Sequence, residues 1–368
     1  MSPRYRSGAD GDTRRIVLNE EQEARWRGLL GGRLATLHDH PVRLPEPLTA
    51  DAWGEHSVIG EDVLADTELV ASGLELVYAS CLSEPRWEVV LRWARSLARQ
   101  VQQAGFRIAD AEDPLPEGRR TVVLALEDLV PIGTDLRGLD ELAAHGVRSA
   151  GIAYNTGSAL GSGLAEVQDD GLTSLGAQAV RRMNELGMAV DVSHASDRCG
   201  IEAAEVTERP LLITHAGARA VWPSDRMKPD EVIRAVADTG GLIGIEAAPG
   251  STRRGPGHPG HDIDDVIAHL EHCAELVGVA HVALGPDTFY GDHVGLYAAA
   301  GWAMRQLPGA RPIDIRFVAG ADNPTETPRQ VAAALIRRGW RDGDIAAVLG
   351  ENAIRVTKEI LQPCPVPN

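Results

Sequence analysis

The segment MAVDVSHASDRCGIEAAEVTERPLLITHA, residues 188–216, contains the pattern that decides the fold of this chain. Two short apolar runs, residues 188–193 and 210–214, lie on either side of a longer stretch of mixed polarity. Short apolar runs that alternate with amphipathic stretches are typical of βα units, which build a parallel sheet. A histidine follows each run directly, His194 after the first and His215 after the second.

The same alternation continues along most of the chain. Helix candidates include residues 16–31, 174–186, 229–239 and 263–277. The eight apolar runs are residues 33–37, 74–80, 121–126, 149–153, 188–193, 210–214, 241–245 and 281–284. Eight such units predict an α/β fold of the (β/α)8 TIM-barrel type, with helical insertions and C-terminal helices. An open doubly wound sheet is the competing fold, but no G-x-G-x-x-G follows the first run to support it.

We expect residues 1–368 to form one barrel domain, because 368 residues is an ordinary length for a barrel with insertions. Residues 1–15 are polar and predict a disordered lead-in. Residues 48–73 are longer than a typical βα connection, and residues 289–328 are irregular and rich in Gly, Pro and Asp, so each is a candidate lid or insertion segment. Residues 329–361 predict two helices.

Composition excludes several classes of partner. The formal net charge of −17 would repel a phosphate backbone, and no basic patch offsets it, so we expect no nucleic-acid partner. No run of about 18 apolar residues occurs, so we expect no membrane partner. The four cysteines, Cys81, Cys199, Cys273 and Cys364, form no C-x-x-C pair and predict free thiols in a reducing compartment. These features predict a cytoplasmic protein, and base rates favour a homodimer.

Side chains that can bind metals follow most of the apolar runs. In a (β/α)8 barrel the carboxyl ends of all strands meet at one mouth, so residues far apart in sequence face one another there. The polar residues at these ends are His38, Asp39 and His40 after the first run, Glu127 and Asp128 after the third, Tyr154 and Asn155 after the fourth, His194 after the fifth, His215 after the sixth and Asp287 after the eighth.

Four imidazoles and a carboxylate at one mouth suit borderline divalent cations. Zn²⁺ is the first expectation, and Mn²⁺, Fe²⁺ or Co²⁺ would also fit. Side chains two apart on a strand point to the same side, so His38 and His40 can bind one ion. Glu127 can bridge two ions through its two oxygens, and His194 and His215 would hold the second ion. The pattern therefore predicts two divalent metal ions, which would polarise a carbonyl and lower the pKa of a water molecule.

Each of these residues has an ordinary structural explanation when it is taken singly. A histidine at a strand end is usually a capped or solvated loop residue, and an acid there usually caps a helix. The coincidence of ligands at four separate strand ends favours the metal site. Asp287 is then placed to take a proton from water and to pass it to a leaving nitrogen. Of the other histidines, His293 follows the eighth run closely enough to contact a substrate.

These residues lie within longer motifs that resemble the membrane dipeptidase family, also called renal dipeptidase, of the amidohydrolase superfamily. The resemblance extends thinly over residues 33–361 and is densest over residues 154–245. DVSHAS and ITHAGARAV are its most specific segments. The motifs are YNTGSALGSG, DDGLTSLGAQAVRRMNELGMAVDVSHAS, LLITHAGARAV, RMKPDEVIRAVADTGGLIGI and the late LGENAIRV.

The resemblance implies a role for each matching position. The family's first-strand H-x-D motif falls on residues 38–40, where His38 matches and His40 replaces the family's aspartate. Histidine can still bind a metal there. The bridging glutamate falls on Glu127, the two ligands of the second metal on His194 and His215, the catalytic aspartate on Asp287, and the arginine that binds the substrate carboxylate on Arg226. Arginine suits that last role because it pairs with a carboxylate in bidentate fashion.

A second departure concerns Tyr154, which stands where the family's dipeptidases have a histidine that contacts the substrate carbonyl. A tyrosine hydroxyl can donate one hydrogen bond to a developing oxyanion but brings no positive charge. Tyr154 is therefore a catalytic and substrate-binding candidate, together with Asn155, Arg226 and His293 as substrate-binding residues. The implied activity is hydrolysis of a C–N bond in a small molecule, with a dipeptide as the first expectation.

Two alternatives stay open from the sequence. In the first, the enzyme hydrolyses a specialised amide, lactam or cyclic amide in a secondary pathway. The features that suggest it are His40, Tyr154 and the unusual segment of residues 289–312. In the other, the barrel is catalytically degenerate and binds a metabolite or a partner protein without turnover. The complete ligand set argues against this last reading.

Overall fold

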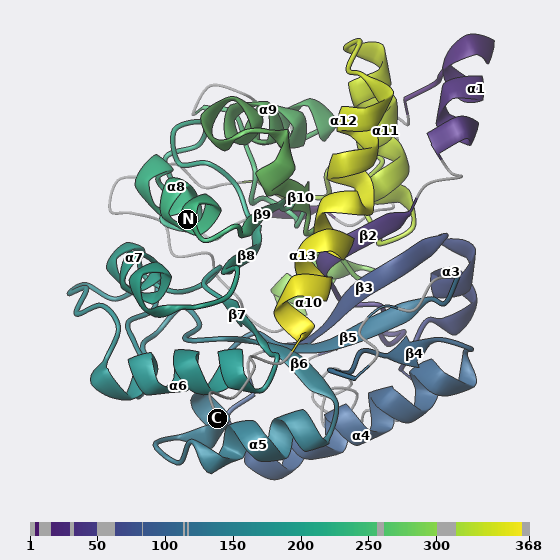
Figure 1. Ribbon diagram of the computed structural model, residues 1–368. Helices are drawn as coiled ribbons and strands as arrows, with labels where there is room; N and C mark the ends of the chain where they lie inside the picture. Colours follow the sequence, from purple (N-terminus) through teal and green to yellow (C-terminus); the bar gives the residue numbers. More distant parts are fainter. Residues whose placement is uncertain are drawn as a thin grey trace.

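The computed structural model describes residues 4–6, 16–29, 33–49, 63–82, 84–112, 115, 118–255, 261–299 and 314–362. Within these ranges eight parallel strands form a nearly closed barrel, and helices cover its outside (Figure 1). The barrel strands, in the order in which they pair, are β10 (Val282–Leu284), β9 (Leu242–Ile245), β8 (Leu212–Ala216), β7 (Ala189–Asp191), β6 (Val147–Gly151), β5 (Thr121–Leu126), β3 (Leu74–Cys81) and β2 (Leu34–Asp39).

Backbone hydrogen bonds join the first and last strands of the barrel just beyond their carboxyl ends. The amide of Asp287 donates to the carbonyl of His38 at 3.1 Å, and the amide of His40 donates to the carbonyl of Thr288 at 3.0 Å. Each of the eight strands overlaps one of the eight predicted apolar runs. The prediction of a (β/α)8 barrel is therefore confirmed.

Helices alternate with the strands, as the sequence pattern predicts. Local capping explains two of them: Thr173 accepts a hydrogen bond from the third residue of α6, and Asp262 with Asp265 forms a capping box at α9. The helices are α1 (Glu20–Leu29), α3 (Asp66–Ala71), α4 (Trp87–Gln103), α5 (Arg137–Ala144), α6 (Ser174–Glu185), α7 (Asp197–Val206), α8 (Asp230–Asp238), α9 (Ile263–Val277), α10 (His293–Ala299), α11 (Glu326–Arg337), α12 (Asp342–Ala346) and α13 (Asn352–Leu361). Short 3₁₀ turns occupy Val130–Ile132 and Val279–His281, and a π-helical turn, Ala347–Glu351, joins α12 to α13.

The hydrophobic core has two layers. One layer lies between the sheet and the surrounding helices, and the other fills the inside of the barrel. The inner layer combines strand residues such as Leu37 and Tyr78 with Ile354, Val356 and Ile360 of α13. Figure 1 shows α13 across the ring of strands. The C-terminal helix therefore plugs the barrel interior with its apolar face.

Ile360 provides a test of this plug, because its side chain is 1% exposed inside the barrel. We expect Ile360→Ala to lower the free energy of unfolding by about 2–5 kcal/mol, since it leaves a cavity among close-packed side chains. Chemical denaturation measures the change. The matched control is Val167→Ala, because Val167 is 94% exposed and its truncation should change stability by less than about 0.5 kcal/mol. Equal effects of the two substitutions would contradict the assigned packing.

Some predicted irregular segments contain regular structure. Arg4–Arg6, within the predicted lead-in, form β1, which pairs in parallel with β11 (Asp314–Arg316). A short strand that was not predicted, β4 (Arg107–Ile108), pairs with β5. The first candidate lid contains α3, and the second contains α10 and β11. Residues 7–15, 50–62 and 300–313 of these segments lie outside the described residues.

Among the described residues, Cys81, Cys199 and Cys273 are free thiols, as predicted. Cys364 lies outside these residues. In the same part of the chain, every helix is too short or too polar to cross a lipid bilayer.

Candidate metal centre

Four of the predicted residues form one tight cluster at the carboxyl end of the barrel. His38 and His40 come from the end of β2, Glu127 follows β5 and Asp287 follows β10. Nε2 of His40 lies 3.0 Å from Oδ1 of Asp287 and 3.4 Å from Oε1 of Glu127. Nε2 of His38 lies 3.6 Å from the same two carboxylate oxygens. Their potential ligand atoms all lie within 4.8 Å of one another, as a shared cation requires.

An irregularity in strand pairing gives His38 and His40 their direction. Leu37 packs inside the barrel, so regular alternation would also turn Asp39 inward. The pairing of β2 with β3 shifts register just before Asp39. Asp39 instead accepts a hydrogen bond from the hydroxyl of Thr288 at 2.9 Å, and the two histidines on either side face the mouth. A bulge of this kind re-aims side chains next to a site.

Asp287 has an unusual backbone conformation. Its φ of 56° lies in the left-handed region, which residues other than glycine rarely adopt. The hydrogen bond from its amide to the carbonyl of His38 holds this conformation. The carboxylate thereby reaches Nε2 of His40 at 3.0 Å. Backbone strain at a residue that faces a cluster of ligands is typical of a functional position.

His194 and His215 form the second half of the cluster. His194 follows β7, His215 lies in β8, and their Nε2 atoms are 3.0 Å apart. The ring of His215 also stacks on that of His38, with 3.6 Å between ring centroids. Burial lowers the pKa of both His194 and His215 well below the usual value, so both rings are neutral. Two neutral imidazoles that point Nε2 at one place suit a cation held between them.

Hydrogen bonds at Nδ1 of His40 and of His194 direct the Nε2 atoms of both rings toward the cluster. Nδ1 of His40 lies 2.9 Å from the carbonyl of Ser80, which can only accept, so Nδ1 carries the proton. Nδ1 of His194 lies 2.9 Å from Oδ1 of Asn155. An amide oxygen also accepts, so the same tautomer follows. Such partners of the second nitrogen are characteristic of metal-binding histidines. Asn155, predicted to bind substrate, thus positions His194.

Asp191 supports His215 and was not predicted from the sequence. Its carboxylate accepts hydrogen bonds from the hydroxyls of Ser193 and Thr214, both at 2.5 Å. Oγ1 of Thr214 in turn lies 2.9 Å from Nδ1 of His215. Asp191 therefore orients His215 through Thr214 and keeps the proton on Nδ1. The only signal in the sequence was its place inside the strand that precedes His194, which also suits a structural residue.

We expect Asp191→Asn to weaken metal binding by about 10–100-fold, which is typical of changes in hydrogen-bond partners of metal ligands. The physical reason is that Ser193 and Thr214 donate to different oxygens of Asp191, whereas the amide of asparagine has only one accepting oxygen and a nitrogen that donates. Competition with a chromophoric chelator measures the Kd for Zn²⁺. Asp238→Asn, on the exposed end of α8, is the matched control and should leave the Kd unchanged. An unchanged Kd for Asp191→Asn would contradict the role of this network.

The carboxylates of the cluster are anionic despite their burial. Burial alone would raise the pKa of Glu127, but the imidazoles of His38 and His40 beside its carboxylate lower it to about 2. Burial likewise opposes ionisation of Asp287, and the hydrogen bond with His40 lowers its pKa below the usual range. For His40 burial lowers the pKa, and the hydrogen bond with Asp287 then raises it to about 10. The anionic oxygens therefore attract positive charge to this position.

The residues present fit a divalent cation. Among the described residues, Nε2 of His38 and Oε2 of Glu127 are buried without any hydrogen bond. Buried polar atoms without a partner are rare in proteins and need an explanation. Both atoms belong to the side-chain types that bind borderline divalent metals. A cation at this cluster satisfies both atoms at once.

The other predicted residues line the same mouth. The ring of Tyr154 stacks on His194, with 4.1 Å between centroids. Burial raises the pKa of Tyr154 well above its usual value, so its hydroxyl remains a hydrogen-bond donor. His293 is buried at the start of α10, where its ring meets Phe289 edge-on, and Phe289 stacks on His40 at 4.2 Å. The structure therefore brings Tyr154 and His293 to the same mouth as the predicted metal ligands.

Arg226 lies in the segment between β8 and α8, and its side chain is 15% exposed. Nη2 donates to the carbonyl of His215 at 2.9 Å and pairs with a carboxylate oxygen of Glu246 at 2.8 Å. Glu246 was not predicted, although it directly follows β9, which is the signal used for the other strand ends. Tyr297 of α10 meets His293 edge-on at 4.7 Å, and no sequence pattern singled it out.

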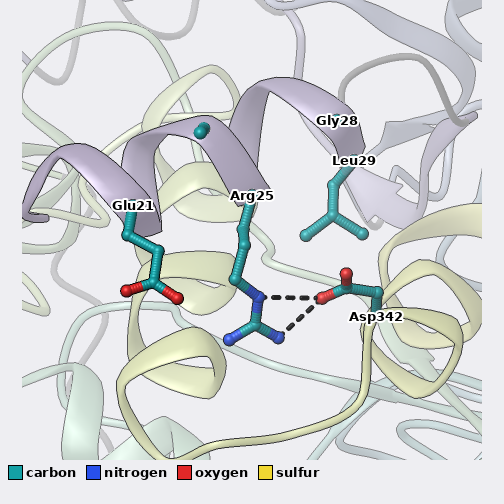
Figure 2. A pocket seen from close by; sticks show the side chains of 6 residues that line it. Glu21, Arg25, Gly28, Leu29 and Asp342 are labelled. Carbon is teal, nitrogen blue, oxygen red and sulfur yellow. Dashed lines mark hydrogen bonds and ion pairs between the residues drawn. The ribbon is translucent and has the colours of Figure 1, made fainter.

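A separate surface pocket has no residue in common with the barrel mouth. It lies between α1 and α12, as Figure 2 shows, and Glu21, Ala24, Arg25, Gly28, Leu29 and Asp342 line it. The guanidinium of Arg25 pairs with the carboxylate of Asp342 at 2.6 Å. The guanidinium of Arg25 is therefore already paired with a carboxylate of the protein, and none of the predicted site residues lies in this pocket.

Known proteins resemble this chain in sequence and in fold. Dipeptidase tcpJ of Claviceps purpurea is 30% identical over 190 residues, which is 52% of this chain and 39% of that relative. The chain thus spans less than half the length of this curated relative. An amidohydrolase from Pseudomonas aeruginosa has the same fold, with a TM-score of 0.73, 19% identity, and coverage of 92% of this chain and 99% of that one.

A metallo peptidase from Rhodobacter sphaeroides, solved with a phosphinate mimic of the dipeptide L-Ala-D-Ala, also shares the fold. Its TM-score is 0.67 at 20% identity, over 89% of this chain and 99% of that one. Residues 86–297, more than half of the chain, match the family described as membrane dipeptidase, Peptidase family M19. The chain belongs to the membrane dipeptidase family.

Proposed function

We propose that this protein is a metal-dependent hydrolase that cleaves the C–N bond of small dipeptides. It would use two divalent ions bound to the protein, with Zn²⁺ as the first expectation. The observation that carries the proposal is the convergence of His38, His40, Glu127, His194 and His215 on one mouth, beside Asp287. Membership of the membrane dipeptidase family and the dipeptide mimic in the Rhodobacter sphaeroides structure support a dipeptide as substrate.

The cluster divides into two sets of ligands. His38 and His40 would hold one ion together with Glu127, and His194 and His215 would hold the other. Glu127 has a second carboxylate oxygen available, so it can serve both sets. When bound, the two ions supply Lewis-acid polarisation of the scissile carbonyl and lower the pKa of the attacking water.

The remaining chemistry belongs to side chains of the chain itself. Asp287, anionic at neutral pH, accepts a proton from the attacking water and delivers it to the leaving amine nitrogen. The protonated hydroxyl of Tyr154 donates a hydrogen bond to the carbonyl oxygen as negative charge develops on it. Tyr154 is aligned for this role because its ring stacks on the ring of His194.

The first experiment combines metal analysis with an activity assay. Protein purified without chelator is expected to contain about two divalent ions per chain and to hydrolyse L-Ala-D-Ala or other small dipeptides. Dialysis against a chelator should abolish the activity, and added Zn²⁺ should restore it. Two ions without turnover of any dipeptide in a panel would overturn the substrate while leaving the metal centre intact. No ion after reconstitution would overturn the metal centre itself.

A further inference from the structure

The pair formed by Arg226 and Glu246 is a feature of the mouth that the proposed chemistry does not use. Glu246 is the first residue after β9 and is 2% exposed. Its carboxylate oxygen lies 2.8 Å from Nη2 of Arg226. The guanidinium also donates to the carbonyl of His215 at 2.9 Å and reaches that of Ser193 at 3.5 Å. Both terminal nitrogens of Arg226 are therefore occupied by groups of the protein.

Arg226 lies within electrostatic range of the reacting groups. The positive charge of Arg226 lowers the pKa values of His194 and Tyr154. The negative charges of Asp287 and Glu127 raise the pKa of Glu246. Because Arg226 donates to the carbonyl of His215, the pair adjoins the metal centre and is close enough to meet one end of a bound dipeptide.

Glu246 depends on Arg226 for its charge compensation. Burial raises the pKa of Glu246 to about 7, and Arg226 is the strongest influence that opposes this shift. A buried carboxylate without a cationic partner is strongly unfavourable. A substrate carboxylate that displaced Glu246 from Arg226 would leave the Glu246 carboxylate buried without a cationic partner. A substrate carboxylate that shared Arg226 with Glu246 would lie beside the negative charge of Glu246. Either outcome makes binding of an anionic group at Arg226 costly.

We infer that Glu246 is a specificity-determining residue, which neutralises Arg226 and biases the site toward dipeptide derivatives whose C-terminal carboxylate is masked as an amide, an ester or a ring. The inference rests on the proposed function, because it concerns the substrate of the same mouth. It assigns no new step to the reaction. The C-terminal end of the substrate meets an ion pair rather than a free guanidinium.

The test compares L-Ala-D-Ala with its C-terminal amide in the wild type and in Glu246→Gln. Glutamine keeps the shape of the side chain and removes its charge, so Arg226 becomes available to a carboxylate. We expect the wild type to cleave the amide with the higher kcat/KM. Glu246→Gln should raise kcat/KM for the free acid at least about tenfold relative to the amide. Glu275→Gln, an exposed position of α9, makes the same chemical change away from the mouth and should alter neither value.

Calorimetric binding of the same two compounds to metal-free protein gives a readout that does not depend on turnover. The free acid should bind at least about tenfold more tightly to Glu246→Gln than to the wild type, and the amide should bind both equally. Glu246→Ser serves as a second variant if glutamine impairs folding. An unchanged ratio between acid and amide in both measurements overturns the inference. If the wild type and the variants cleave neither compound, but Glu246→Gln still shifts the binding ratio between acid and amide, the proposed function is overturned and the role of Glu246 stands.

Discussion

Asp287→Asn is expected to lower kcat for dipeptide hydrolysis by about 10²–10⁴-fold, the usual contribution of a general acid–base group. Asparagine cannot accept the proton of the attacking water or deliver it to the leaving nitrogen. The substitution suits the site, because asparagine also tolerates the left-handed backbone conformation at φ 56°. The bound ions should remain, since the histidines and Glu127 are unchanged.

Steady-state kinetics and elemental analysis of the same preparation separate chemistry from metal binding. Asp238→Asn, an exposed position in α8, is the matched control and should retain the wild-type kcat. Wild-type activity in Asp287→Asn would show that the proton passes through another group. Loss of metal together with activity would instead make Asp287 a ligand, as its distance of 3.6 Å from Nε2 of His38 allows.

Glu127→Gln should have the second large effect, through the metals rather than through the proton. Glu127 is 4% exposed and faces Nε2 of both His38 and His40. Glutamine removes the negative charge that compensates the ions and leaves one oxygen instead of two. Substitution of a hydrogen-bond partner of a metal ligand lowers the affinity for the metal by about 10–100-fold, and substitution of a ligand itself should lower it at least as much.

Thermal unfolding with and without Zn²⁺ provides the most direct measurement for Glu127→Gln. An ion that binds only the folded state stabilises it by about 2.7 kcal/mol at a hundred times its Kd. The wild type should therefore show a large rise in Tm on addition of Zn²⁺, and Glu127→Gln should show little. Glu275→Gln should respond like the wild type. An equal rise in all three proteins would refute the assignment of Glu127 as a ligand.

The sequence alone was sufficient to predict the barrel and most of its mouth. A buried strand is mostly apolar, and a parallel barrel brings the carboxyl ends of all strands together. Polar residues directly after apolar runs were therefore visible as a set, and the structure places His38, Glu127, His194 and His215 within one cluster. The helix predicted over residues 263–277 has the observed limits of α9, because a capping box marks its start and Gly278 its end.

Only the tertiary structure decided which groups interact at the mouth. The register shift that turns His38 and His40 inward depends on the pairing of β2 with β3. The partners of Asp191 and the ion pair between Arg226 and Glu246 join residues on different strands and loops. A sequence pattern indicates which residues of a segment are buried, because burial follows the local alternation of apolar and polar residues. Hydrogen bonds and charge compensation between distant segments depend on distances of a few ångströms, which are set only when the barrel closes.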